Sequence, residues 1–282
     1  LLLAVASFCA ALLVMEVVFR IADIHGNYHK AHAHKCIRDP QDPIRWARFG
    51  YIPLSTHRTY YHTDPRDYFG LSTSVDHHFN SAGWRDEEHS IAKPAGEYRI
   101  LGLGDSYLMG QGVHAEDPYF SQLQTLLIQA GLPSEIKTIN TGISGNNTVH
   151  QAQMLLSRGF AYDPDLVIVN FVPNDVEQNL ESDEPLIEFY RNYTRITQQP
   201  DWLSNYSYLW SWARQRILQQ IVARRYINES LASFDRTSEK WNVCRNALLK
   251  IVETCRQNNI PLMGAVFPFF HELNCDYPFQ PV

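Results

Sequence analysis

The sequence predicts an α/β fold in which a parallel sheet is covered by helices and is preceded by one N-terminal transmembrane helix. Three observations carry this prediction. The first fifteen residues are almost entirely apolar, and from Tyr98 onward short apolar stretches alternate with stretches of helical spacing. The stretch "DLVIVNF" at 165–171 is apolar nearly throughout, as expected of a strand covered on both faces. Strands that alternate with helices form parallel sheets with right-handed crossovers.

The N-terminal stretch has the length and composition of a membrane-spanning helix. Residues 1–15 are apolar apart from Ser7, and Glu16, three apolar residues and Arg20 follow. A helix of this length spans roughly 28 Å, close to the thickness of the bilayer interior. A signal-peptide core is the alternative, but no small-x-small cleavage site follows. We expect a single membrane anchor over residues 1–20.

Composition excludes several classes of protein. The chain has 282 residues, of which 45% are hydrophobic and 12% aromatic, so it is globular rather than disordered. A net charge of −6 argues against a nucleic-acid binder, which needs a basic face. Cys244 and Cys255 are expected on one helix roughly 16 Å apart, too far to form a disulfide. A disulfide that involves Cys36 or Cys275 stays open, and no cysteine pair has zinc-ligand spacing.

Residues 21–97 show little periodicity, and we expect a stalk and an N-terminal lead-in that packs on the main domain. The segment His29–Cys36, "HKAHAHKC", has the composition of a metal site, but no carboxylate or second cluster completes it, so a solvated linker is the preferred interpretation. The segment "NSAGWRD" at 80–86 is expected to form a turn with a buried Trp84 and an Arg85 that pairs with a carboxylate.

Residues 98–282 contain the alternating elements of the main domain. A helix over 117–131 is expected to begin with Asp117 as N-cap and to stop at Gly131. A mostly helical region runs from about Glu184 to Gln257 and is interrupted near Pro200. Its arginine-rich part at 208–226 is either a membrane-surface helix or, preferably, an amphipathic helix packed on the sheet. The expected strands are 98–104, 135–140, 165–171 and 260–267, and a second helix is expected at 148–159.

Polar or glycine-rich loops follow three of these strands, and ligands bind at the carboxyl ends of parallel strands. The first loop places Ser106 near a helix N-terminus, where its N–H can donate to an oxyanion. The second contains Gly145, whose N–H is uncrowded, and the third contains Asn174, whose amide is a further donor. Together they predict a serine nucleophile with a three-donor oxyanion hole. Asp105 is expected to brace the turn.

These three blocks, in this order and each after its own strand, resemble the SGNH (GDSL-type) hydrolase family. The similarity runs from about Tyr98 to Phe267, and "NSAGWRD" with the anchor resembles the membrane-anchored bacterial members. The resemblance implies a flavodoxin-like three-layer α/β/α domain with Ser106 as nucleophile and Gly145 and Asn174 as oxyanion donors. It requires no metal or organic cofactor. Val172-Pro173 stand where the family often has Gly-x, which is expected to alter the loop but to keep the amide donor.

The resemblance also implies a late Asp-x-x-His block, and none of the twelve histidines has this spacing. His150 at a helix start and His271 after the last strand are the two alternatives for a base. The preferred expectation is a C-terminally incomplete domain without its catalytic histidine, which binds but hydrolyses poorly.

The function expected is an extracytoplasmic, membrane-anchored serine esterase whose substrate is an ester, with the O-acyl group of a cell-envelope glycan as one class. An O-acyltransferase with the same site is one alternative, and a non-catalytic binding protein is the other. The expected partners are this substrate and the membrane, without nucleic acid. The expected domains are an anchor at 1–20, a stalk and lead-in at 21–97, and the hydrolase-like domain at 98–282.

Overall fold

A computed structural model of the chain describes residues 2–24, 50–60, 68–69, 74–132, 135–176 and 201–268. Its residues divide into two compact units. One unit contains residues 1–34 and 180–229, and the other contains residues 35–179 and 230–282.

The larger unit is built on a four-stranded parallel sheet, ordered β4-β3-β5-β6. The strands are β3 (Tyr98–Leu103), β4 (Ile136–Asn140), β5 (Leu166–Phe171) and β6 (Leu262–Val266). In the register, Gly102 lies opposite Asn140, and Phe171 lies opposite Val266. The carboxyl ends of the strands therefore meet at one edge, and the α/β class with a parallel sheet is confirmed.

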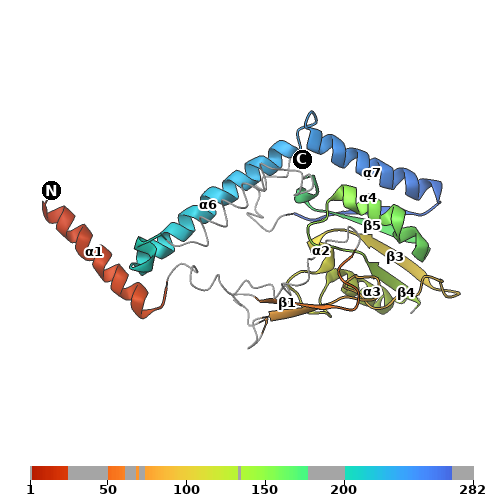
Figure 1. Ribbon diagram of the computed structural model, residues 1–282, viewed down its shortest axis with the longest axis horizontal. Helices are drawn as coiled ribbons and strands as arrows, with labels where there is room; N and C mark the ends of the chain where they lie inside the picture. Colours follow the sequence, from red (N-terminus) through yellow and green to blue (C-terminus); the bar gives the residue numbers. More distant parts are fainter. Residues whose placement is uncertain are drawn as a thin grey trace. The chain divides into compact units, whose positions relative to one another are not determined.

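Helices cover both faces of this sheet, as Figure 1 shows. The helix α3 (Tyr119–Gln129) covers one face, and α4 (Thr148–Ser157) and α7 (Glu239–Gln257) cover the other. Side chains alternate along β3, so that Ile100 packs with Phe120 of α3, whereas Leu101 and Leu103 pack with α4 and α7. The sheet and the helices on its two faces form the three layers of an α/β/α domain.

Two details of the secondary structure differ from the prediction. The N-cap of α3 is Pro118 rather than Asp117, and no side chain caps this helix. The Asp117 carboxylate accepts a hydrogen bond from the Tyr68 hydroxyl, a long-range contact that no local pattern reveals. The second detail is an unpredicted antiparallel pair, β1 (Thr56–Tyr60) and β2 (Ser74–His78), within the expected stalk and lead-in. These strands lack the alternation of apolar and polar residues that marks most strands.

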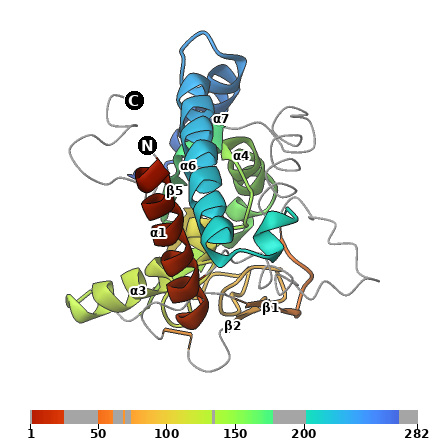
Figure 2. The same cartoon turned by 90° about the vertical axis from the view of Figure 1, so that its left-hand side faces the viewer.

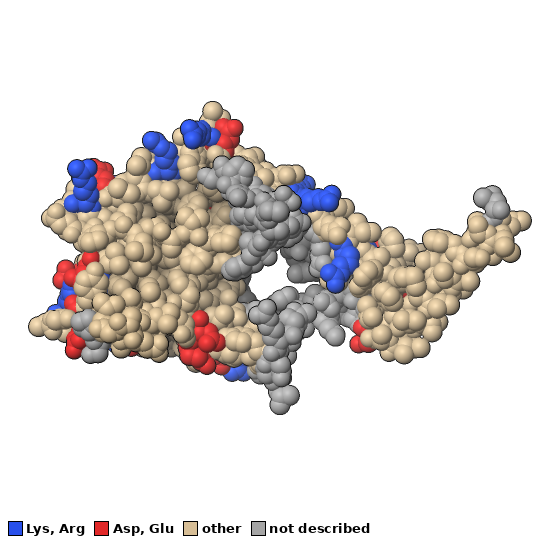
Figure 3. Space-filling view, turned by 180° about the vertical axis from the view of Figure 1, so that it is seen from behind, with Lys and Arg blue, Asp and Glu red and all other residues tan. Residues whose placement is uncertain are grey.

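The smaller unit contains α1 (Leu2–Ile21) and most of α6 (Tyr208–Ser233), with the short helix η5 (Leu203–Asn205) before α6. Among the described helices, α1 alone is long and apolar enough to cross a membrane, with a mean hydropathy of 2.5 and none of its residues buried. The face of α1 seen in Figure 3 is almost free of charged side chains. A membrane anchor and a signal sequence both fit these properties.

The apolar stripe expected along α6 is only partly buried. Ile217 and Ile221 are 53% and 58% exposed. Ser211 and Ser230 of α6 are buried. Most of α6 and the sheet belong to different units, so the packing of this helix on the sheet stays a prediction.

Cys244 and Cys255 share one helix, α7, as predicted, and both are buried free thiols. Burial raises the pKa of the Cys244 thiol to about 11. Cys36 and Cys275 lie outside the described residues, so the disulfide that was left open is not tested.

Candidate active site

Ser106 is the first residue of the short helix α2 (Ser106–Met109), directly after β3. The residue before it, Asp105, is the N-cap of α2, and its carboxylate accepts a hydrogen bond from the Tyr107 N–H at 2.9 Å. Gly104 lets the helix turn back onto the strand, because a Cβ there would lie 2.6 Å from the Cβ of Leu108. Local sequence therefore places the serine at the carboxyl edge of the sheet, with its own N–H in the first turn of a helix.

Asp105 connects the serine to the third loop. Its side chain is fully buried and takes hydrogen bonds from the Ser106 hydroxyl at 3.4 Å and from the Asn174 side chain. Burial raises the pKa of the Asp105 carboxyl, although these donors and the Tyr107 N–H act in the opposite direction. These contacts agree with the expected role of Asp105, which is to brace the turn.

Gly145 lies in the turn that follows β4. The Asn146 N–H donates to the Ile143 carbonyl at 3.0 Å, which closes a four-residue turn with Gly145 at its third position. The φ of Gly145 is +83°, the left-handed value that a type II turn requires at this position. A Cβ at Gly145 would meet nothing within 4 Å, so the backbone conformation, and not lack of space, selects glycine here.

Hydrogen bonds tie this second loop to α2 and the residues after it. The Asn140 side chain donates to the Leu108 carbonyl at 2.8 Å and accepts from the Gly142 N–H at 2.9 Å. The Ser144 hydroxyl donates to Gln111 Oε1 at 2.8 Å. The loop that carries Gly145 is thus fixed beside the helix that carries the serine.

Asn174 lies in a 3-10 helix, η4 (Pro173–Val176), directly after β5. The adjacent Asp175 anchors this turn, because its carboxylate accepts from the Val172 N–H at 2.8 Å and from the Gln151 side chain of α4 at 3.0 Å. The Oδ1 atom of Asn174 is buried without a hydrogen-bond partner among the described residues. Sequence reasoning named Asp175 only as part of the loop and missed Gln151, whose buried amide had no local signal.

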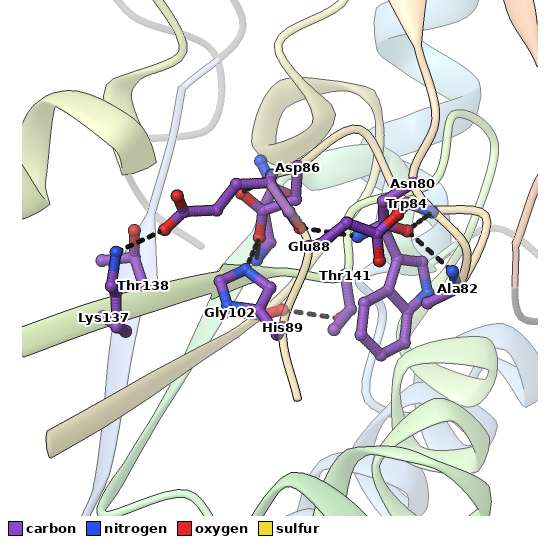
Figure 4. A network of polar contacts seen from close by, with 12 residues as sticks. Asn80, Ala82, Trp84, Asp86, Glu88, His89, Gly102, Lys137, Thr138 and Thr141 are labelled. Carbon is purple, nitrogen blue, oxygen red and sulfur yellow. Dashed lines mark hydrogen bonds and ion pairs between the residues drawn. The ribbon is translucent and has the colours of Figure 1, made fainter. Parts of the chain in front are cut away.

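The "NSAGWRD" segment does more than form the expected turn. Trp84 is completely buried, as predicted, and the Asn80 side chain accepts hydrogen bonds from the N–H groups of Ala82 and Trp84 (Figure 4). The guanidinium of Arg85 donates to backbone carbonyls at the end of α2 and beyond it, namely those of Met109 at 3.4 Å, Gly110, and Val113 at 2.7 Å. Arg85 therefore holds the carboxyl end of the nucleophile helix. Spacing in the sequence did not indicate this role.

Asp86 lies at the centre of a second set of polar contacts, and Figure 4 shows its contact with His89. Its carboxylate accepts from His89 Nε2 at 2.8 Å and from the Asn140 N–H at 2.7 Å. Burial raises the pKa of the Asp86 carboxyl, although both donors oppose this shift. Arg85 and Asp86 thus connect one segment to both the first and the second loop of the candidate site.

The two histidines considered as bases have different outcomes. His150 is part of the capping box of α4, where its Nδ1 accepts from the Asn147 N–H at 3.3 Å and its own N–H donates to Asn147 Oδ1 at 3.2 Å. These bonds give His150 a structural role at the start of α4. His271 lies outside the described residues. Within the part of the chain that the structure describes, Asp105 is the one side chain bonded to the Ser106 hydroxyl.

Tyr107, which directly follows Ser106, belongs to a group of aromatic side chains. The Tyr107 and Phe267 rings are 6.4 Å apart, and the Tyr119 and Phe267 rings are 5.0 Å apart. An apolar cavity of about 590 Å³ lies between β6 and α7, and Phe267 and Pro173 are among the residues that line it. No group of three potential metal ligands occurs among the described side chains, and His29–Cys36 lies outside them.

A three-layer α/β domain that presents a serine at a helix start, beside two further loops at the same sheet edge, has the architecture of a serine hydrolase acting on esters. The family model of the GDSL-like lipase/acylhydrolase family matches residues 103–279. The chain therefore belongs to this family, and the resemblance to SGNH (GDSL-type) hydrolases is confirmed.

Several solved structures are similar to the chain. A variant of the esterase AlinE4 is 19% identical and matches 61% of this chain and 59% of its own, with a TM-score of 0.32. AlinE4 itself, an SGNH-hydrolase family esterase, is 19% identical over 60% of this chain and 99% of its own, with a TM-score of 0.25. TesA is 16% identical over 57% of this chain and 99% of its own, with a TM-score of 0.26. No curated protein sequence matches the chain.

Proposed function

We propose that this esterase uses Ser106 as its nucleophile and stabilises the oxyanion with the Ser106 N–H, the Gly145 N–H and the Asn174 amide. The observation that carries the proposal is the contact of Asp105 with both Ser106 and Asn174, since it joins the first and third loops through one buried carboxylate. The link from Ser144 to Gln111 supports the nearby position of the Gly145 loop.

In this mechanism, the Ser106 Oγ forms a bond to the ester carbonyl carbon while its proton passes to a general base. The carbonyl oxygen becomes an oxyanion, which three N–H donors stabilise by roughly 3 kcal/mol each. The ester C–O bond then breaks, the leaving oxygen takes the proton, and water hydrolyses the acyl-serine. The base we propose is a histidine, as in other serine hydrolases, and His150 and His271 are the two candidates in this sequence.

For the substrate we propose an O-acyl group on a sugar, of the kind found on cell-envelope glycans. The aromatic group of Tyr107, Tyr119 and Phe267 supports this choice, because Tyr107 directly follows Ser106 and aromatic faces stack well against the apolar faces of sugar rings. Transfer of the acyl group to a sugar hydroxyl would use the same site, and product analysis with and without a glycan acceptor separates the two reactions.

The test of the nucleophile is labelling of the full chain by a fluorophosphonate probe, together with release of acetate from an acetylated glycan. We expect labelling of the native chain, loss of labelling in Ser106→Ala, and unchanged labelling in Ser157→Ala, whose serine is exposed at the end of α4. Labelling that persists in Ser106→Ala would overturn the nucleophile assignment. His150→Ala and His271→Ala, assayed in parallel, test the two histidines.

We also propose that α1 is retained as a membrane anchor and that the catalytic unit faces the extracytoplasmic side. A contact between α1 and the start of α6 supports retention, because the Glu16 carboxylate accepts hydrogen bonds from the N–H groups of Tyr208 and Leu209, each at 3.0 Å. Cleavage of α1 would leave these first-turn donors without this partner.

Intact mass of the protein from membranes, after carbonate extraction, tests retention of α1. Orientation is tested with Ser157→Cys and a membrane-impermeant maleimide, with the parent chain as the background for native cysteines. A mature protein that lacks α1 contradicts the anchor, and labelling of Ser157→Cys only after the membrane is opened contradicts the extracytoplasmic side.

A further inference from the structure

The last turns of α1 and the first turn of α6 are joined by a compact set of polar contacts. Glu16 accepts from the Ser207 hydroxyl at 2.8 Å, in addition to the two backbone N–H groups of α6. The Ser207 hydroxyl oxygen in turn accepts from the Trp210 N–H at 3.0 Å. The first N–H donors of α6 are therefore satisfied partly by a carboxylate of the apolar helix.

Packing and charge reinforce this junction. The Arg20 guanidinium pairs with Glu16 at 2.8 Å and lies 5.0 Å above the ring of Tyr208. The rings of Phe19 and Trp212 meet edge to face at 5.4 Å. Figures 1 and 2 both show the carboxyl end of α1 beside the start of α6. Because Glu16 is five residues from the end of α1, the start of α6 lies within roughly 8 Å of that end along the helix axis.

Large aromatic side chains gather at this same level. Three of the six tryptophans of the chain lie between residues 202 and 212, together with two tyrosines. Trp202 is 72% exposed, Tyr206 is 69% exposed and Trp210 is 39% exposed. The rings of Trp202 and Tyr206 are 6.0 Å apart, so they form one patch. Exposed tryptophan and tyrosine beside the end of an apolar helix are typical of the membrane–water boundary, where amphipathic rings are most favourable.

The charges of this region suit the same location. Glu16 pairs with Arg20, and Asp201 pairs with Arg214 at 3.2 Å. The Asp201 carboxylate also accepts from the Trp210 Nε1–H at 3.2 Å. Glu16 and Asp201 therefore each have an arginine partner, which lowers the cost of bringing these two carboxylates to the headgroup region.

We propose that Trp202, Tyr206 and Trp210 form an interfacial belt that binds the headgroup–acyl boundary of the bilayer that α1 crosses. This inference rests on the proposed anchor, and it adds a second membrane contact at a different place in the chain. The belt fixes the level of the start of α6 at the membrane surface, so that α6 leads away from the lipid at a defined point.

The test uses the full chain in phosphatidylcholine nanodiscs, in which bromine atoms on the acyl chains quench nearby tryptophan emission. Bromine close to the headgroup is expected to quench more than bromine near the bilayer centre. Trp202→Phe and the double variant Trp202→Phe/Trp210→Phe are expected to be quenched less than the parent chain. The control Trp241→Phe, at the start of α7, keeps Trp202 and Trp210, so the decrease in quenching expected of the two other variants is not expected here.

The two proposals fail in different ways. If the chain resists carbonate extraction and keeps α1 but Trp202→Phe and the double variant are quenched like the parent, the anchor stands and the belt is wrong. If the chain does not resist extraction, the anchor itself is wrong. Self-association of the chain through this patch, with unquenched Trp202, would also overturn the belt, since a second copy would then cover the aromatics. Trp202→Phe replaces an exposed indole ring with a phenyl ring, so this variant is expected to fold normally, which circular dichroism verifies.

Discussion

The carboxylate of Asp86 accepts a hydrogen bond from the backbone N–H of Asn140 at 2.7 Å, so a residue far outside the active-site loops fixes the end of β4. The Asn140 side chain in turn holds α2 and the second loop in place, because it donates to the Leu108 carbonyl and accepts from the Gly142 N–H. Asp86 is a positioning residue, and its effect on catalysis acts through the two loops that it holds.

Replacement of Asp86 by alanine is expected to lower kcat more than it changes KM, and to lower the free energy of unfolding by about 1–3 kcal/mol, because the buried Asn140 N–H loses its acceptor. Chemical denaturation and esterase kinetics measure the two effects. Glu87→Gln is the matched control, since Glu87 pairs with Lys137 at 2.9 Å on the surface. A normal kcat in Asp86→Ala would mean that the second loop keeps its position without this contact.

Arg85→Lys is expected to slow labelling of Ser106 by a fluorophosphonate probe while the chain stays folded. A lysine has one compact charged group and cannot reach the carbonyls of Gly110 and Val113 at once, as the planar guanidinium does. Arg58→Lys is the control, because Arg58 also makes a two-point contact, with Asp76, but on the exposed hairpin. Equal labelling rates in the two variants would show that Arg85 does not position the nucleophile helix.

Gly145→Ala is expected to reduce turnover strongly at a stability cost of about 1–2 kcal/mol, because alanine disfavours the positive φ of this turn and the turn sets the direction of the Gly145 N–H. Gly96→Ala provides a close control. Gly96 has a φ of +85° and equally open surroundings, but it lies in the loop before β3, at the opposite end of that strand. We expect similar losses of stability in both variants and a loss of kcat only in Gly145→Ala, and equal kinetics would remove Gly145 from the oxyanion hole.

Acid is expected to destabilise the larger unit through His77. Burial lowers the pKa of His77 to about 4 from an ordinary value of 6.5, and the charge of Arg85 acts in the same direction. In the unfolded chain the His77 imidazole therefore takes up a proton near pH 6.5, whereas in the folded chain it does so only near pH 4. The free energy of unfolding consequently falls as the pH drops from 6.5 toward 4. At pH 5 this amounts to about 2 kcal/mol.

His77→Gln is expected to lose less stability than the parent chain between pH 7 and pH 5, in urea denaturation at each pH, because it removes this titration. His78→Gln, which changes the exposed neighbour, is expected to behave as the parent does. The raised pKa values of Asp86 and Asp105 change stability in the opposite direction. A carboxyl that binds its proton more tightly in the folded chain makes the free energy of unfolding fall as the pH rises. Both carboxyls are present in all three chains, so the comparison isolates His77.

The parts of the site that local sequence encodes were predictable. Strand β5 is apolar nearly throughout, the turn at Gly104–Ser106 follows one strand, and the glycine-containing loop with Gly145 follows another. Each of these signals arises within a few neighbouring residues, which is why the order of strands and helices and the candidate residues could be read before the fold was known. The N-cap of α3 and the hairpin β1–β2 were missed because contacts with distant residues determine them.

By itself, the sequence determined the parallel α/β architecture, the apolar helix α1 and the three candidate residues Ser106, Gly145 and Asn174, since periodicity and turn chemistry are local properties. Only the tertiary structure decided what holds these residues in place. The contacts of Arg85 with the end of α2 and of Glu16 with the start of α6 join segments 25 and more than 190 residues apart. Hydrogen-bond donors and acceptors have no spacing rule over such distances, because only the folded chain brings them within 3 Å of each other.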